Sequence, residues 1–91
     1  MLNNQYIEQL ILLDNAWQDV QHFLDAKGLS CPMPLLKTKL LMKQMQAGET
    51  LCVLASDGGS WRDIPAYLNQ VEYELIKAEQ YDDTYAFLIK K

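Results

Sequence analysis

Residues 20–34 read VQHFLDAKGLSCPMP, and they predict a strand, a tight turn and the start of a helix. The first six residues are suited to a strand, and Gly28 marks the turn that follows. Proline is tolerated in the first turn of a helix, so Pro32 and Pro34 predict a helix that begins beside Cys31. We expect Gly28, Pro32 and Pro34 to position the Cys31 thiol.

The helix that begins at Pro32 is expected to run to about Ala47, with Gly48 just past its end. The apolar run Thr50–Ala55 then predicts a buried strand. Alternation of this kind between helical and extended patterns continues to the end of the chain.

A second helix is predicted from Ser60, because Ser60–Asp63 has the form of a capping box. We expect it to end near Gln70 and to carry Pro65 in about its first turn, where a missing N–H does least harm. Two strands follow, near residues 73–79 and 84–90, and the turn at residues 81–83 joins them into a hairpin.

The order strand, helix, strand, helix, strand, strand predicts an α/β fold. We expect a two-layer sandwich in which two helices cover one face of a mixed four-stranded sheet. Residues 20–91 form this domain, and residues 1–19 form an N-terminal extension with a possible short helix. A chain of 91 residues has room for one domain and none for a large enclosed active site, so its chemistry should lie at the surface.

Composition argues against several classes of function. The net charge is −4 and no block of Lys and Arg occurs, so general binding to nucleic acid is not expected. The apolar run at residues 10–13 is too short for a signal peptide or a membrane span, which predicts a cytoplasmic protein without membrane contact. With two cysteines and one histidine, we expect neither a disulfide framework nor a metal site.

Cys31 is the candidate catalytic residue. A thiol reacts as its thiolate, and the N–H groups and dipole of a helix N-terminus favour that anion. The two neighbouring prolines remove N–H donors, so we expect only a modest lowering of the Cys31 pKa. The alternative is a small apolar residue at a helix cap. Cys52, inside an apolar strand, is expected to be inert, and His22 is expected to be structural.

The stretch at residues 24–34 resembles the signature of the TusA-like (SirA/YeeD-type) sulfur-carrier family. The sequences GETL at 48–51 and RDIP at 62–65 fall at that family's spacing, and the resemblance covers about residues 20–91. It implies a two-layer α/β fold and a sulfurtransferase-like carrier that needs no cofactor. Whether the chain is an enzyme in the strict sense stays open.

The resemblance also implies a route for sulfur. Cys31 would accept persulfide sulfur from a donor such as a cysteine desulfurase and pass it to an acceptor protein. In the best-known branch this relay feeds the formation of 2-thiouridine in tRNA. By position, Asp57, Arg62 and Asp63 would belong to the surface that meets partners. Residues 1–19 and the loop at 58–61 depart from the family pattern, which leaves the acceptor open.

A partner surface is also predicted from the residues around Cys31. No acidic residue occurs between Asp25 and Glu49, but four lysines do: Lys27, Lys37, Lys39 and Lys43. Helical periodicity places Leu36 and Leu40 off the core side of the first helix, with Lys37 and Lys43 beside them. They form either a docking surface or a solvated face, and the extension could instead cover the two leucines.

Trp61 and Arg62 are expected at the start of the second helix, on the sheet edge where Cys31 also lies. Arg62 is a candidate for binding a persulfide anion or a partner carboxylate, or it makes an ordinary surface ion pair with Asp63 or Asp57. Turn and helix-cap roles are sufficient to explain the two aspartates.

Two other functions remain open at this point. The chain could be a non-catalytic regulatory or interaction module with the same fold. It could also be a redox protein that uses reversible oxidation of Cys31.

Overall fold

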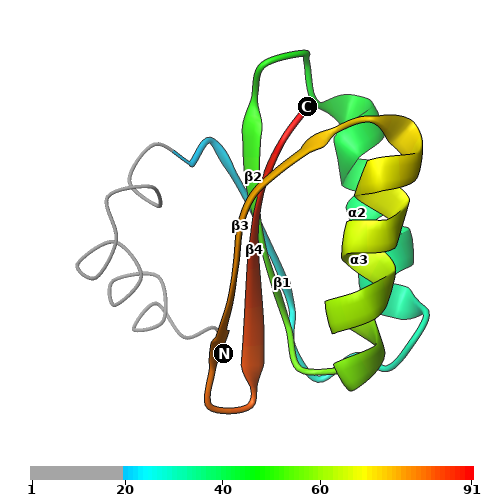
Figure 1. Ribbon diagram of the computed structural model, residues 1–91, viewed down its shortest axis with the longest axis vertical. Coiled ribbons are helices and arrows are strands. Elements are labelled where there is room, and N and C mark those ends of the chain that lie inside the picture. The colour runs from blue at the N-terminus through cyan, green and yellow to red at the C-terminus, as the bar shows by residue number, and fades with distance from the viewer. Residues whose placement is uncertain (1–19) are drawn as a thin grey trace.

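The computed structural model describes residues 20–91 of the chain. Figure 1 shows the order of the elements. They are β1 (His22–Ala26), α2 (Met33–Gln44), β2 (Thr50–Ala55), α3 (Gly58–Val71), β3 (Glu74–Tyr81) and β4 (Thr84–Lys90). The extension expected over residues 1–19, with its short helix, lies outside the described residues.

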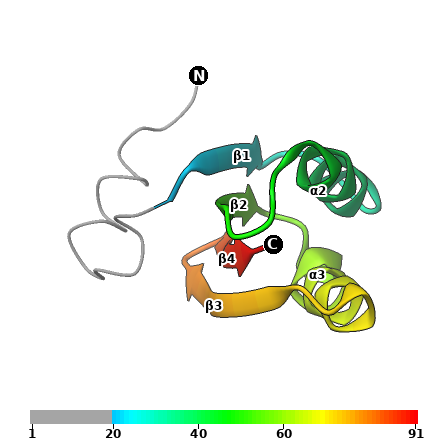
Figure 2. The ribbon, with the colours of Figure 1, turned by 90° about the horizontal axis from the view of Figure 1, so that it is seen from above.

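The four strands form one mixed sheet in the order β1-β2-β4-β3. β1 pairs with β2 in parallel, whereas β4 pairs antiparallel with both β2 and β3. Seen from above, α2 and α3 lie side by side on the same face of the sheet (Figure 2). This arrangement confirms the predicted α/β fold, with a mixed four-stranded sheet and two helices.

Successive side chains of the central strands point to opposite faces of the sheet, and both faces are apolar. Leu51 and Val53 of β2 belong to the core cluster under the helices, together with Met42, Met45, Ile64, Leu68, Phe87 and Ile89. Cys52 and Leu54 of the same strand point to the opposite face, where they pack with Ala86 and Leu88 of β4. Cys52 is therefore a buried residue of a central strand, as expected.

α2 ends earlier than predicted. Its last residue is Gln44, and Met45 caps it with an extended backbone. Gly48 does not close the helix: with φ +91 it lies further along the loop, where its N–H donates to the carbonyl of Lys91 over 3.0 Å. Gly48, which was predicted to end the helix, therefore lies in the turn before β2 and binds the backbone of Lys91.

α3 begins two residues before the predicted start, and the capping box is wrong. The N-cap is Asp57, without a side-chain hydrogen bond, and Ser60 is buried inside the first turn. Because β2 ends at Ala55, only two residues separate the strand from the helix. The earlier start puts Pro65 beyond the first two turns, where it has no N–H to donate to the carbonyl of Trp61.

Candidate functional site

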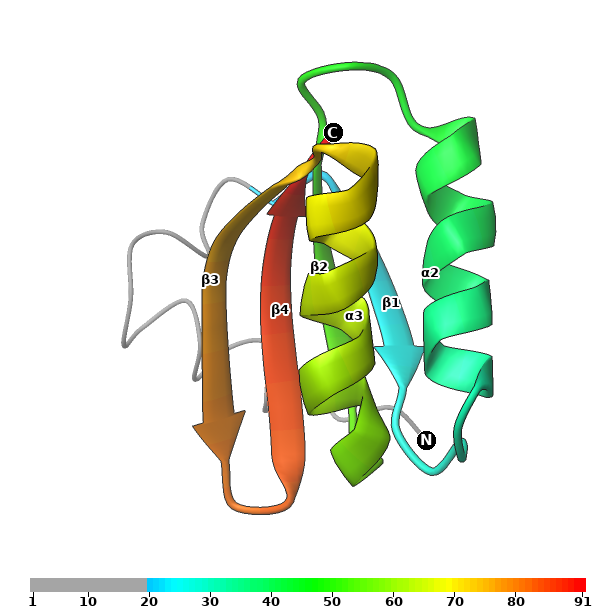
Figure 3. The same cartoon turned by 45° about the vertical axis from the view of Figure 1, so that its right-hand side comes forward.

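Two loops meet at one edge of the sheet. Because β1 and β2 are parallel, the segments that follow them leave from the same edge, and both helices begin there (Figure 3). Gly28, with φ +84, donates its N–H to Ser56 Oγ over 2.8 Å. The positive φ suits a glycine. This hydrogen bond ties the loop that carries Cys31 to the segment that leads into α3.

Cys31 lies just outside α2, two residues before its first residue. The helix begins at Met33, Pro32 is the N-cap and the buried Pro34 is in the first turn. The Cys31–Pro32 peptide bond is cis. The sequence prediction, with Cys31 as the cap and Pro32 as the first helical residue, is therefore displaced by one position. Met33 donates its N–H to the Ser30 carbonyl over 2.9 Å, so this donor is already engaged within the turn.

The Cys31 side chain is exposed and contacts a carboxylate of the other helix. Its Sγ donates to Asp63 Oδ2 over 3.6 Å. Arg62 Nε donates in turn to Asp63 Oδ1 over 3.3 Å. The structure thus brings together Cys31, Arg62 and Asp63, three residues that the family resemblance named from separate parts of the sequence.

The electrostatic surroundings raise the pKa of the Cys31 thiol, contrary to the lowering expected from a helix N-terminus. Desolvation contributes most, followed by the hydrogen bond to Asp63 and by the negative charges of Asp63 and Asp57, while Arg62 opposes them. The expectation was wrong because the thiol is desolvated, and because Cys31 stands before the N-cap with a carboxylate as its hydrogen-bond partner. An anion at this position would face another anion.

Asp57 and Gly59 complete the surroundings of the thiol. Asp57 Oδ2 is buried and, among the described residues, has no hydrogen-bond partner. A Cβ atom at Gly59 would lie 3.0 Å from that oxygen and 3.7 Å from the Cβ of Cys31. The absence of a side chain at Gly59 therefore leaves room for Asp57 beside Cys31. Sequence reasoning missed Gly59, although the Gly-Gly pair after a strand was a visible signal.

Arg62 and Trp61 differ in how far they are free to meet a partner. The Arg62 side chain is 81% exposed and forms the ion pair with Asp63 that was the simpler of its two predicted roles. Trp61 is 42% exposed, but its ring packs at a tilt against Tyr85 and Phe87, at centroid distances of 5.3 and 6.0 Å. Part of Trp61 therefore belongs to the packing between α3 and β4.

The predicted leucine pair lies on the exposed side of α2. Leu36 is 43% exposed and Leu40 is 62% exposed, and Lys37 and Lys43 are exposed beside them. We call these four residues the α2 surface. The alternative cover, residues 1–19, lies outside the described residues. Lys39 is separate, because its Nζ lies 5.0 Å from the centre of the Tyr67 ring on α3.

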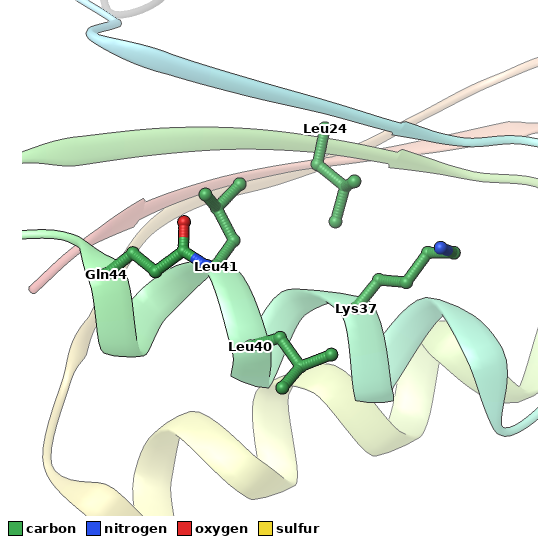
Figure 4. Close-up of a pocket in the computed structure, with 5 residues that line it drawn as sticks. All are labelled: Leu24, Lys37, Leu40, Leu41 and Gln44. Carbon is green, nitrogen blue, oxygen red and sulfur yellow. The ribbon is translucent and has the colours of Figure 1, made fainter.

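A shallow pocket of about 250 Å³ lies beside the α2 surface, between the helix and β1 (Figure 4). Its lining consists of Leu24, Lys37, Leu40, Leu41 and Gln44. Ligand pockets usually measure about 300–1,000 Å³, so this one is smaller than a typical small-molecule site. Sequence patterns did not indicate the pocket, because Leu24 belongs to a different element from the other lining residues.

Three further features were checked in the described residues: His22, possible metal ligands and possible membrane-spanning helices. His22 Nε2 lies 2.9 Å from Glu49 Oε1, which accounts for the histidine as a structural residue. Residues 20–91 contain no group of three or more His, Cys, Asp and Glu side chains that could hold a metal ion. Neither α2 nor α3 is long and apolar enough to cross a membrane.

Comparison with known proteins identifies a matching family model and a similar solved structure. The family model described as sulfurtransferase TusA matches residues 22–91. Among solved structures, the fold is similar to that of a SirA-like protein from Desulfitobacterium hafniense, with a TM-score of 0.70 and 21% sequence identity. That match covers 77% of this chain and 96% of the other.

Proposed function

Because this chain belongs to the sulfurtransferase TusA family, we propose that it carries sulfur as a persulfide on Cys31. Family membership supports a sulfur-carrier or sulfurtransferase role in general, and with it contact with donor and acceptor proteins. The proposal adds that Cys31 is the residue that carries the sulfur and that the sulfur is held as a persulfide. It also adds a location, the cytosol, because the relay needs a thiol that stays reduced.

The observation that carries the proposal is the contrast in access between the two cysteines. Cys31 is exposed at the edge where both helices begin, and Cys52 is buried in the sheet. A carrier must present its sulfur to two different proteins in turn. Among the described residues, only Cys31 offers a thiol at the surface for such contacts.

The transfer is an exchange between sulfur atoms. The Cys31 sulfur attacks the outer sulfur of a donor persulfide, the S–S bond of the donor breaks, and the donor cysteine leaves as a thiolate that takes up the proton. The product is a persulfide on Cys31. Delivery to the acceptor repeats the exchange in the opposite sense. Neither step changes the total oxidation state of the sulfur atoms, so the cycle needs no cofactor.

We propose the α2 surface as the place where partners dock. Leu36 and Leu40 supply apolar contact, and Lys37 and Lys43 supply positive charge in a chain whose net charge is −4. Charge of this kind mainly raises the rate at which partners meet. Asp63 of α3 contacts Cys31 and pairs with Arg62, and in this proposal these two residues, with Asp57 and Trp61, complete the partner surface.

The donor in this proposal is a cysteine desulfurase or another protein persulfide. The acceptor is a downstream sulfur-transfer protein, and formation of 2-thiouridine in tRNA is the pathway that the family resemblance favours. In this proposal the protein meets the proteins of that pathway and does not bind the nucleic acid itself, because its net charge is −4 and its sequence has no block of Lys and Arg.

Incubation with a cysteine desulfurase and free cysteine tests the proposal. A carrier gains one cyanide-labile sulfur per chain, located on Cys31 by mass spectrometry. An interaction module gains none. A redox protein gains none from the desulfurase and instead forms a sulfenic acid with dilute peroxide. Either of these last two results would reject the carrier function.

A further inference from the structure

The Cys31 thiol points its proton at a carboxylate. Sγ donates to Asp63 Oδ2 over 3.6 Å, and Arg62 binds the other oxygen, Oδ1, over 3.3 Å. A sulfur atom can donate this hydrogen bond only while it keeps its proton. Loss of the proton would leave two negative charges facing each other across the same distance, which disfavours the thiolate.

The other charges near Cys31 do not relieve this repulsion fully. Asp57 adds a second negative charge, and Arg62, although positive, is 81% exposed and therefore strongly screened by water. In the loop that carries Cys31, Lys27 pairs with Asp25 over 3.1 Å. Desolvation and these negative charges together raise the pKa of the thiol in the free protein. A carrier nevertheless needs a thiolate when it attacks a persulfide.

We propose that Asp63 holds Cys31 as a thiol in the free carrier, and that a cationic side chain of the docked sulfur donor releases the thiolate by pairing with Asp63 Oδ2. This inference rests on the proposed function and names the kind of group that the donor must present. Asp63 is the accessible member of the pair of carboxylates, since Asp57 Oδ2 is buried.

The chemical step balances without another reactant. The donor cation neutralises Asp63, so the proton on Sγ is no longer held. Sγ attacks the outer sulfur of the donor persulfide, the donor S–S bond breaks, and the leaving thiolate of the donor takes the proton that Sγ gives up. Before docking, the protonated sulfur is a poor nucleophile, which protects Cys31 from oxidation and from reaction with small electrophiles.

Alkylation of Cys31 by iodoacetamide, followed across pH in a Cys52→Ala background, tests the first half. Asp63→Asn removes the charge with little change in shape, so it should lower the thiol pKa and accelerate alkylation several-fold at neutral pH. Asp63→Glu keeps the charge, so its alkylation rate should stay close to that of the parent protein. Arg62→Gln removes the opposing charge and should slow alkylation. High salt should shrink both effects.

Circular dichroism and thermal melting establish that each variant is folded. Unchanged or slower alkylation of folded Asp63→Asn would overturn the inference, and so would acceleration by Arg62→Gln. Because the two substitutions are expected to act in opposite directions, a general loosening of the loop would not reproduce the pattern.

Transfer from two kinds of donor tests the second half. Inorganic polysulfide does not dock, so Asp63→Asn should acquire labile sulfur from it faster than the parent. A cysteine desulfurase does dock, so the same variant should be loaded more slowly. Equal changes with both donors would reject a role for Asp63 in docking. Failure of the parent protein to gain sulfur on Cys31 from either donor would instead reject the proposed carrier function.

Discussion

The loop before α2 and the centre of β2 each hold one cysteine, and the two sites differ in almost every respect. Cys31 is exposed, follows a turn and contacts charged side chains of α3. Cys52 is 2% exposed and is surrounded by Leu54, Ala86 and Leu88. One site is accessible to proteins, and the other is closed to them.

The two thiols nevertheless share one property, since the pKa of each is raised. Burial raises the pKa of Cys52 to about 12. For Cys31, desolvation is joined by the carboxylates of Asp63 and Asp57. The direction of the pKa shift therefore does not distinguish the candidate sulfur carrier from the inert residue. Access does, together with neighbouring charges that a partner can change.

The largest expected effect is the loss of sulfur loading in Cys31→Ser. Serine provides no sulfur, so labile sulfur after treatment with a cysteine desulfurase should fall to background. The fold should persist, because Cys31 lies outside the helix and is exposed. Cys52→Ala is the matched control and should load normally, with a stability loss of about 1 kcal/mol. Loss of loading in both folded variants would instead indicate a two-cysteine mechanism.

A second effect separates the cysteines by stability at alkaline pH. The pKa of Cys52 rises from 9.0 to about 12 on folding. Its thiol form therefore contributes stability that is fully present below pH 9 and is lost as the pH rises toward 12. The loss is at most about 4 kcal/mol, from roughly 1.4 kcal/mol per pKa unit.

The measurement is the free energy of unfolding in urea between pH 8 and the highest pH at which the protein folds. Cys52→Ala should reduce the fall in stability across this window relative to the parent protein. Cys31→Ser should reduce it much less, because Cys31 is exposed. Parallel curves for the parent and Cys52→Ala would show that burial does not hold the Cys52 thiol in its neutral form.

The third prediction concerns charge on the α2 surface. Replacing Lys37 and Lys43 with Glu should slow loading from a cysteine desulfurase by roughly tenfold at low salt, because steering by charge affects encounter rates on that scale. The effect should fade at high salt. Lys90→Glu, on the exposed end of β4, is the control for each single reversal, because it changes the net charge by the same amount, and it should change loading little. Equal slowing by Lys90→Glu and by either single reversal would mean that net charge, and not this surface, controls the encounter.

The smallest expected effect on the fold comes from the apolar part of the α2 surface. Leu36→Ser and Leu40→Ser should alter stability by less than about 1 kcal/mol, because both side chains are substantially exposed. They should weaken donor binding with little dependence on salt. Leu41→Ser is the contrast, since Leu41 packs against the core and its loss should lower the melting temperature clearly. A similar drop for Leu36→Ser would show that Leu36 is part of the core.

Two of the four strands were predicted with their bounds, whereas the first and third strands and the helix ends were displaced by one to three residues. Thr50–Ala55 and Thr84–Lys90 have the bounds that their apolar runs and flanking turns indicated. The helix starts were displaced, because a cap depends on backbone conformation and on which hydrogen bonds neighbouring loops already use. The N-cap of α3 is Asp57 and not Ser60, and the N-cap of α2 is Pro32 and not Cys31.

The sequence by itself determined the order of the elements, the exposed cysteine in its Cys-Pro-Met-Pro setting and the family. It could not determine what the thiol contacts. Cys31 and Asp63 are 32 positions apart, and they meet because parallel pairing of β1 with β2 places both helix starts at one edge of the sheet. The rise in the Cys31 pKa comes first from desolvation and then from that contact, and both depend on what surrounds the thiol in space. Only the tertiary structure decided that a carboxylate accepts the hydrogen bond of the thiol.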